Sequence, residues 1–411
     1  MSIDARPIED VLVGEREEWL DGPPHELFKR LRHECPVHWT EKITEYPDEE
    51  GFWSVTKADD VHTVSRDWQT YSSEVGGITA LTNAVMPLEL TQSMFIGMDP
   101  PKHDRLKALF QRGFTPKRIA EHETEIRAIT RAVLDRIEGR GTCDLVEDVA
   151  QPVVSRVIGS FMGISPEDDD VWARLMNTVL GAGDPDINPE GVETVMQRDV
   201  PEIFERCSKL IAERRENPTD DLTSVLVHAD VDGEKLEEHE IVMGFFLLMA
   251  AGNDSTKATY CSGMRAVMED PEQRRLLLDD PSLVPDAVEE SLRMFPAFAH
   301  FRRTATTDTV LSGCPIKQGD KVVMWYPSSN RDEDRYEDPD RFDLRRRAEH
   351  QAFGAGGRHF CLGTALARLE LKILMEETLV RFPEIAIDGT PRHVESPFAN
   401  QLKSLPVRLR P

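Results

Sequence analysis

The sequence predicts a mainly α-helical protein with small β-sheets, an α+β fold, in a single domain. Helical periodicity dominates residues 100–296 and returns over residues 362–382, whereas short strand-like runs fall near residues 36–57, 304–326 and 385–411. These runs lie toward both ends of the chain, where they can pair into one small sheet. We therefore expect the 411 residues to form one interwoven domain and not separate modules.

Composition and charge narrow the function classes. The chain has 49 Lys and Arg against 75 Asp and Glu, a net charge of −26, which argues against non-specific binding to nucleic acid or anionic membranes. The most apolar run, Ile241–Gly252, is shorter than the about 20 residues of a membrane-spanning helix, so we expect no membrane span. No signal-peptide pattern is seen, and the six cysteines are scattered without zinc-type spacing. A cytoplasmic location is expected.

The first quarter of the chain is expected to contain strands and a loop before the helices begin. Pro36–Thr40 and Gly51–Thr56 are predicted strands. Tyr71–Ile96, with paired glycines and mixed apolar residues, is predicted as a long functional loop. Pro100 and Pro101 suit the first turn of the first long helical stretch.

Beyond residue 296 the pattern changes to strands and then returns to a helix. Thr304–Leu311, Pro315–Lys317 and Lys321–Trp325 are predicted strands, joined by turns that contain glycine. Leu362–Phe382 has apolar residues at helical spacing and is predicted as a helix.

One segment, Phe353–Gly363 (FGAGGRHFCLG), places a lone cysteine after three glycines and directly before that helix. Such a cysteine can be a small buried hydrophobe, an activated nucleophile or a single axial thiolate to a metal cofactor such as haem. The glycines allow the backbone to approach a flat cofactor closely, and the start of a helix stabilises a thiolate. No histidine base for a nucleophile is suggested, and the spacing matches no phosphate loop. The segment therefore favours Cys361 as an axial thiolate.

This segment resembles the haem-binding loop of cytochrome P-450 enzymes, F-G-x-G-x-H/R-x-C-x-G, with one extra residue between Phe353 and Cys361. Some bacterial branches of the family carry the longer loop. The resemblance implies a single triangular-prism-like domain that holds haem b, with Cys361 as the metal ligand and with Phe353, Gly354 and His359 beside the cofactor.

A second motif, AGNDST at residues 251–256, resembles the acid–alcohol segment of the family. The resemblance implies that Gly252 opens a groove beside the cofactor. It also implies that Asp254, with Ser255 or Thr256, delivers protons for oxygen activation. Ser255 stands where the family has threonine, which leaves its hydroxyl less fixed in rotamer.

A third motif is the E-x-x-R pair of Glu290 and Arg293, whose side chains share one helix face. The family adds a third arginine, which Arg341 in the segment DPDRFD matches. The resemblance implies a structural role for these three residues in support of the cysteine loop.

Positive partners for the two haem propionates complete the resemblance. His103 and Lys107 lie four residues apart and match the family's H-x-x-x-R segment, although lysine replaces arginine. Arg303 precedes the predicted strands and His359 belongs to the cysteine loop. These four residues are the expected propionate partners.

The resemblance implies a monooxygenase that inserts one atom of O2 into a C–H bond of a lipophilic small molecule such as a steroid, terpenoid or branched lipid. No flavin, nicotinamide or iron–sulfur motif is present, so ferredoxin and ferredoxin reductase are the expected electron donors. Arg345–Arg347 and Arg358 are candidates for the ferredoxin-docking surface. The substrate pocket is expected to include Leu247, Ala250, Ala251, Ala299 and Phe398.

Other functions stay open. A haem-thiolate enzyme can use peroxide or perform chemistry other than oxygenation, but an intact Asp254–Ser255 pair favours O2 activation. A haem sensor or ligand carrier without turnover is a further alternative, and an unrelated fold with Cys361 as nucleophile is the most remote one.

Overall fold

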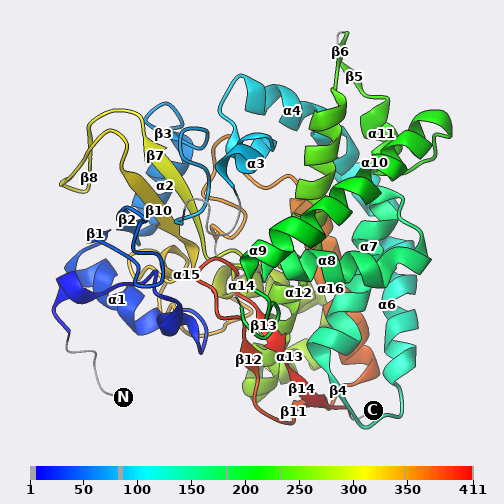
Figure 1. Cartoon of the computed structure of the whole chain (residues 1–411). Coiled ribbons are helices and arrows are strands. Elements are labelled where there is room, and N and C mark those ends of the chain that lie inside the picture. Colours follow the sequence, from blue (N-terminus) through cyan, green and yellow to red (C-terminus); the bar gives the residue numbers. More distant parts are fainter. Residues whose placement is uncertain (1–5, 82–86, 182–183, 232, 348, 410–411) are drawn as a thin grey trace.

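The computed structural model of the chain describes residues 6–81, 87–181, 184–231, 233–347 and 349–409. A β-rich part, built from the N-terminal strands and the strands between residues 300 and 325, lies beside a larger helical part, and the C-terminal strands lie at the lower end of the helical part (Figure 1). Among the described residues, no helix combines the length and the apolar character that crossing a membrane requires.

The α-helices of the described residues are α1 (His25–Glu34), α2 (Ala58–Arg66), α3 (Leu88–Gln92), α4 (Lys102–Gln111), α5 (Pro116–Glu121), α6 (Glu123–Ile137), α7 (Gln151–Met162), α8 (Asp169–Leu180), α9 (Val192–Thr194), α10 (Val200–Glu216), α11 (Leu222–Val227), α12 (Glu238–Glu269), α13 (Pro271–Asp279), α14 (Val284–Met294), α15 (Tyr326–Ser329) and α16 (Thr364–Arg381). The strands are β1 (Val37–Thr40), β2 (Phe52–Val55), β3 (Tyr71–Ser72), β4 (Thr142–Asp144), β5 (Asp230–Val231), β6 (Glu234–Lys235), β7 (His300–Ala305), β8 (Thr309–Leu311), β9 (Cys314–Ile316), β10 (Lys321–Trp325), β11 (Ala386–Ile387), β12 (Arg392–His393), β13 (Leu402–Ser404) and β14 (Pro406–Arg408).

The main sheet joins the N-terminal strands to strands from the last third of the chain. Its order is β1-β2-β10-β7-β3, with β10 parallel to β2 and antiparallel to β7. All five residues of β10 are buried, as expected for an apolar central strand. A second, three-stranded sheet pairs β14 near the C-terminus with β4 from the middle of the chain. The predicted pairing of strands from opposite ends is therefore confirmed.

Helix α12 is the central element of the helical part. It is 32 residues long and begins with a capping box formed by Glu237 and Glu240. It packs against α7, α8, α14 and α16. The apolar run Ile241–Gly252 lies within it as a largely buried helical segment.

The largest differences from the sequence predictions lie near the N-terminus. The segment predicted as a long loop, Tyr71–Ile96, contains β3 and the short helix α3, and its residues 82–86 lie outside the described residues. Helices α1 and α2 were not predicted, although Leu27, Phe28 and Leu31 form a buried helical face in α1. The predicted strand Thr304–Leu311 is two strands, because β7 ends at residue 305 and β8 begins at residue 309.

Candidate active site

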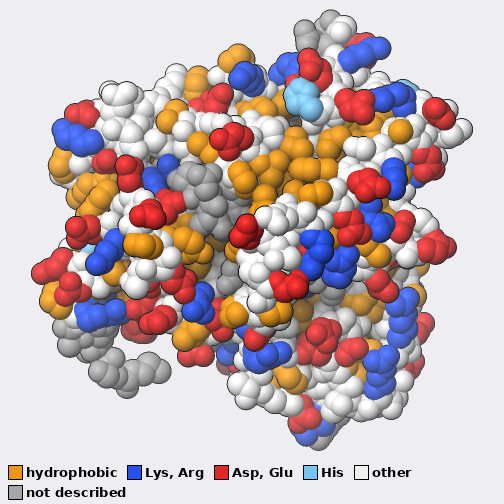
Figure 2. Space-filling view, in the orientation of Figure 1, with side chains coloured by type: hydrophobic (Ala, Val, Ile, Leu, Met, Phe, Trp, Pro, Cys, Tyr) orange, Lys and Arg blue, Asp and Glu red, His pale blue; other side chains and the backbone are white. Residues whose placement is uncertain are grey.

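A cavity with mainly apolar walls lies between α12 and the cysteine loop. Leu247 and Ala251 of α12, Ala297 and Phe298 after α14, and Phe301 of β7 lie in its wall. On the face shown in Figure 2, hydrophobic side chains gather between the β-rich part and the helical part. The cavity therefore suits a ligand with a largely apolar surface.

The cysteine loop holds Cys361 at this cavity, just before α16 begins. Gly354, Gly356 and Gly357 have φ values of 92°, 85° and 84°, which favour glycine. A Cβ on Gly357 would lie 2.6 Å from a backbone oxygen of α2, so the loop packs tightly against that helix. The Cys361 N–H closes the loop by donating to the Phe353 carbonyl at 2.9 Å.

The Cys361 thiol has accessible surface in the cavity, although protein surrounds it. Desolvation by the surrounding protein raises the pKa of this thiol above its ordinary value. The Gly363 N–H and the positive charges of Lys107 and Arg368 act in the opposite direction. These three groups therefore favour the thiolate, which is the form of cysteine that binds a metal ion.

The four expected propionate partners lie together in the cavity wall: His103 and Lys107 on α4, Arg303 on β7 and His359 in the cysteine loop. The His103 and His359 ring centroids are 4.2 Å apart. Burial is the largest cause that lowers the pKa of each of the four groups, and the charges of the other three add to it at His359. The cluster is therefore poised to stabilise negative charge placed in the cavity.

Lys107 also connects α4 to the cysteine loop. Its Nζ donates to the Phe360 carbonyl at 2.7 Å and to the Arg358 carbonyl, which ties α4 to the cysteine loop. An ammonium group has three donors, so one is still available to a ligand. The Nε2 atom of His359 lies 3.2 Å from Ser73 Oγ.

The residues present fit haem. Cys361 supplies one sulfur ligand for a metal, and the cationic cluster supplies partners for two carboxylates. The glycine-rich backbone of the cysteine loop leaves Phe353 and Gly354 in the cavity wall, where a flat cofactor can lie against them.

Helix α12 passes the cavity at Gly252, Ser255 and Thr256. A Cβ on Gly252 would lie 2.9 Å from Cδ1 of Ile158, so glycine permits the close approach of α7. The Ser255 hydroxyl donates to the Ala251 carbonyl at 2.7 Å, one helical turn earlier. Ser255 and Thr256 both line the cavity, so either hydroxyl can serve the alcohol role.

Asp254 lies behind the cavity wall and is not among the described residues that line it. It is only 4% exposed, and its Oδ1 accepts from Lys257 Nζ at 2.9 Å and from Asn253 Nδ2 at 2.8 Å. Lys257 Nζ also donates to Gln151 and Asn177, each at 2.8 Å. Lys257 was not among the residues predicted from the sequence, although a lysine three residues after an acid in a helix is a visible signal.

Glu370 of α16 is an acid that lines the cavity, and it was not predicted from the sequence. It lines the cavity, is 2% exposed, and has its pKa raised to about 8 by burial, against the effect of a hydrogen bond with Thr256. Its carboxyl group is therefore mainly protonated at neutral pH. The signal in the sequence is an acid on an apolar helix face, four residues after Leu366 and three before Ile373.

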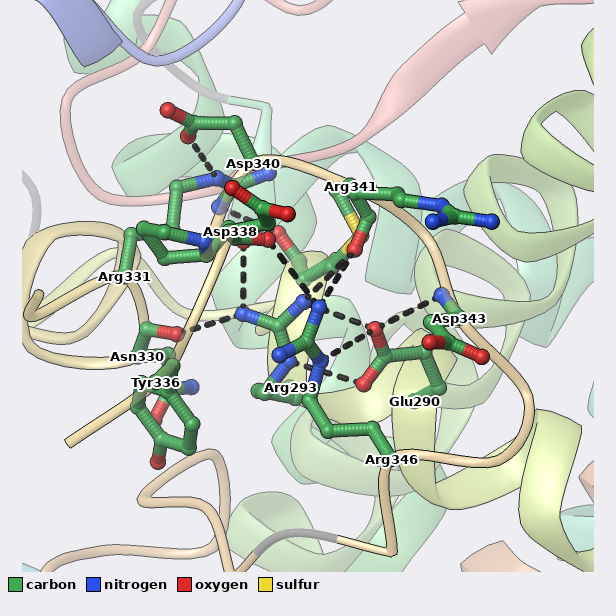
Figure 3. A network of polar contacts seen from close by, with 12 residues as sticks. Glu290, Arg293, Asn330, Arg331, Tyr336, Asp338, Asp340, Arg341, Asp343 and Arg346 are labelled. Atoms are coloured by element: carbon green, nitrogen blue, oxygen red, sulfur yellow. Dashed lines mark hydrogen bonds and ion pairs between the residues drawn. The ribbon is translucent and has the colours of Figure 1, made fainter.

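The Glu290–Arg293 pair anchors α14 to the segment that precedes the cysteine loop (Figure 3). Arg293 donates to both Glu290 oxygens, at 2.8 Å and 2.7 Å, and both side chains are buried. Arg346 supplies the second guanidinium, with its Nε 3.1 Å from Glu290 Oε1. Arg341, to which the sequence analysis gave this role, is exposed and contributes only its carbonyl, which accepts from Arg293 and Arg346. The assignment of Arg341 is thus corrected to Arg346, because the chain turns the Arg341 side chain outward.

The arginines expected at a docking surface are mostly paired. Arg346 belongs to the network just described, Arg347 lies 3.1 Å from Asp286, and Arg358 lies 2.6 Å from Asp104. A basic patch near the cysteine loop is therefore weaker than the sequence suggests.

Two of the five residues expected in the substrate pocket line the cavity, and three do not. Leu247 and Ala251 line the cavity, but Ala250, Ala299 and Phe398 are not among the described residues that do. Ala250 lies off the helix face that carries the other two. Ala299 packs in the cluster around Trp325, and Phe398 packs behind the rings of Phe298 and Phe301, which line the cavity in its place.

Comparisons with known proteins agree with this geometry. A family model described as cytochrome P450 matches residues 184–396. The methyl-branched lipid omega-hydroxylase of Mycobacterium tuberculosis is 37% identical over 410 residues, covering 98% of this chain and 95% of the relative. The chain belongs to the cytochrome P450 family.

Further members resemble this cytochrome P450 along nearly its whole length. The steroid C26-monooxygenase of Mycolicibacterium smegmatis is 32% identical, covering 93% of this chain and 90% of the relative. The structure of Mycobacterium marinum cytochrome P450 CYP268A2 in complex with pseudoionone has a TM-score of 0.91 and 34% identity, covering 99% of this chain and 100% of that one. The predicted P450 fold is confirmed, and the protein is an oxygenase of the haem-thiolate type.

Proposed function

We propose that this cytochrome P450 inserts one atom of O2 into a C–H bond of a lipophilic small molecule, with electrons from a separate ferredoxin and its reductase. The observation that carries the proposal is the meeting of Cys361, a cationic cluster and an apolar wall in one cavity. Haem b, when bound there, supplies oxygen activation and C–H oxidation.

The chain's own residues hold that cofactor. Cys361 provides the sulfur ligand for the iron, and the backbone around Phe353 and Gly354 supports the cofactor plane. The two carboxylates are bound by the cationic cluster of His103, Lys107, Arg303 and His359. Arg303 is buried and Lys107 is half-buried, so an ion pair with either is less screened by solvent than one at the surface, whereas His103 and His359 can act as N–H donors.

Protons reach the cavity through α12. Asp254 Oδ1 is held by Lys257, whereas its buried Oδ2 has no hydrogen-bond partner among the described residues. Asp254 takes up a proton at Oδ2 and passes it to the hydroxyl of Ser255 or Thr256, both of which line the cavity. Lys257 keeps the carboxylate oriented during this transfer.

Two observations support a substrate class: the apolar side chains of the cavity wall and the ligands named for related proteins. The walls near Leu247, Phe298 and Phe301 are apolar, so they favour an apolar molecule. Two relatives are named for methyl-branched lipids and for steroids, and the solved structure contains pseudoionone. We place the substrate among branched lipids, steroids and terpenoids.

Electrons enter from the side of the cysteine loop, where Phe360 is 42% exposed directly before Cys361. The sequence has no flavin, nicotinamide or iron–sulfur motif of its own. A small iron–sulfur protein can bring its cluster close to this exposed edge, which favours ferredoxin as the donor.

Optical titration of the ferric protein tests the proposal, with a methyl-branched fatty acid, a steroid, a terpenoid alcohol and a sugar as probes. We expect a shift toward high-spin iron with at least one lipophilic probe and none with the sugar. Incubation of that probe with ferredoxin, reductase and isotopically labelled O2 should then yield a product that carries one labelled oxygen. A shift with the sugar alone, or a product without label, would overturn the proposal.

A further inference from the structure

A closed ring of four side chains lies beside the cysteine loop, and three of them, Arg368, Glu289 and His350, have no role in the function proposed above. Phe353 lines the cavity, and its carbonyl accepts the Cys361 N–H at 2.9 Å. The Arg368 guanidinium carbon lies 4.8 Å from the centroid of the Phe353 ring, within the range of a cation–π contact. Arg368 itself is not among the described residues that line the cavity.

Arg368 is held in this position by Glu289 of α14. Its Nε and Nη2 donate to the two Glu289 oxygens at 2.6 Å and 2.9 Å, the bidentate geometry that arginine favours. The His350 Nε2 lies 3.2 Å from Glu289 Oε2, and the His350 Nδ1 accepts the Ala352 N–H at 3.2 Å. His350 therefore carries its proton on Nε2 and donates it to Glu289. The His350 ring, 5.6 Å from the Phe353 ring between centroids, completes the ring of side chains.

At neutral pH, Glu289 is ionised and Arg368 is protonated. Burial opposes ionisation of Glu289, but hydrogen bonds from His350 and Arg368 outweigh it and lower the pKa to about 2. The hydrogen bond with Glu289 raises the pKa of Arg368. Arg368 is also one of two side-chain cations, with Lys107, whose charge favours the thiolate of Cys361. Lys107 is bound to backbone carbonyls of the loop, which are neutral. Arg368 is bound to the Glu289 carboxylate, whose negative charge partly cancels the effect of the guanidinium on Cys361.

We propose that Arg368, balanced by Glu289, sets the reduction potential of the haem iron bound at Cys361. The inference rests on the proposed function, because it requires haem at that cysteine. Reduction of the iron adds one electron, and hence one negative charge, next to the Cys361 sulfur. A positive guanidinium nearby stabilises that charge, whereas an unbalanced carboxylate opposes it. Arg368 acts through the thiolate and is thus a positioning residue and not a catalytic one.

Two substitutions that remove charges of opposite sign separate an electrostatic role of Arg368 from a structural one. Arg368→Met removes the cation and leaves Glu289 unbalanced, so the potential should fall. Glu289→Gln keeps the cation and removes its balancing charge, so the potential should rise. A merely structural role would move both variants in the same direction or leave both unchanged. Arg368→Lys retains the charge and should stay near the wild-type potential.

The experiment is a spectroelectrochemical titration of the purified holoprotein and these variants. At a fixed potential near the wild-type midpoint, we expect the ferrous-to-ferric ratio to fall about tenfold in Arg368→Met, which corresponds to about 59 mV for one electron. Arg381→Met is the matched control, since Arg381 lies on the same helix but pairs with Asp135 and Glu138 far from the loop. Its potential should equal that of the wild type.

The reduced carbon-monoxide complex of each protein is recorded first. Thiolate-type spectra in all proteins, together with opposite shifts in potential, support the inference. Thiolate-type spectra with equal or same-direction shifts overturn it and leave the proposed function intact. Wild-type protein without haem, or without the thiolate-type spectrum, overturns both.

Discussion

Glu370 provides a test of how the protein accommodates a buried acid beside its active site. The residue is 2% exposed, lines the cavity, and has a hydrogen bond with Thr256. Burial raises its pKa from 4.5 in an unfolded chain to about 8 in the folded protein. Glu370→Gln keeps the shape and the hydrogen-bonding capacity of the side chain but cannot ionise.

The sign and size of the effect follow from proton linkage. Below about pH 4.5 the carboxyl group is protonated in both states, so its contribution to stability is fully present. Between about pH 4.5 and about pH 8 the unfolded chain releases the proton while the folded protein keeps it. Each pH unit in this window lowers the free energy of unfolding by about 1.4 kcal/mol. The loss reaches about 5 kcal/mol at the upper end and is absent in Glu370→Gln.

Unfolding by urea, followed by circular dichroism at about pH 5 and about pH 7, measures this difference. We expect the wild type to lose about 3 kcal/mol relative to Glu370→Gln over these two pH units. Glu349→Gln, at an exposed glutamate, is the control and should follow the wild type. If the wild type and Glu370→Gln show the same pH dependence, Glu370 ionises in the folded protein and the argument from burial fails.

Three further outcomes follow from the contacts around the site. Arg346→Leu should lower the free energy of unfolding by about 2 kcal/mol, since Glu290 loses a charged donor, whereas Arg341→Leu should change it by less than about 0.5 kcal/mol. Chemical unfolding of both variants measures this, and equal effects would restore Arg341 to the network. Lys257→Met should destabilise by about 3 kcal/mol because it leaves the buried Asp254 side chain without its ion-pair partner, and a second change to Asn at residue 254 should recover most of that loss. Additive effects in that double-mutant cycle would show that the two side chains do not interact. Ser255→Ala should lower the rate of product formation by about 10²-fold at unchanged substrate affinity, and an unchanged rate would assign the hydroxyl role to its neighbour.

The sequence was most informative where a function needs fixed local spacing. The cysteine loop could be found because its backbone conformation requires glycine at fixed positions. Gly354, Gly356 and Gly357 all have positive φ, and Cys361 follows them at a short, fixed spacing. The strands β1, β2 and β10 were predicted closely, because alternating or fully buried apolar residues have few other stable arrangements. The pairing of both chain ends in one sheet followed from the same reasoning.

The sequence was least informative where the direction of a side chain depends on tertiary packing. Arg341 and Arg346 are five residues apart in an irregular segment, and only the folded chain determines which guanidinium turns toward Glu290. Ala250 and Ala251 are adjacent alanines that the sequence alone does not distinguish, yet only Ala251 lies on the helix face at the cavity. Asp254 was identified as an acid, but its ion-pair partner Lys257 is held by Gln151 of α7 and Asn177 of α8, contacts that only the folded chain provides.

The proposed function requires that this cytochrome P450 binds haem through the sulfur of Cys361. The absorption spectrum of the reduced carbon-monoxide complex, recorded for the wild type and for Cys361→Ala, tests it most directly. We predict the thiolate-type band in the wild type and its loss in the variant. The same band in both proteins, or no haem in the wild type, would contradict the claim.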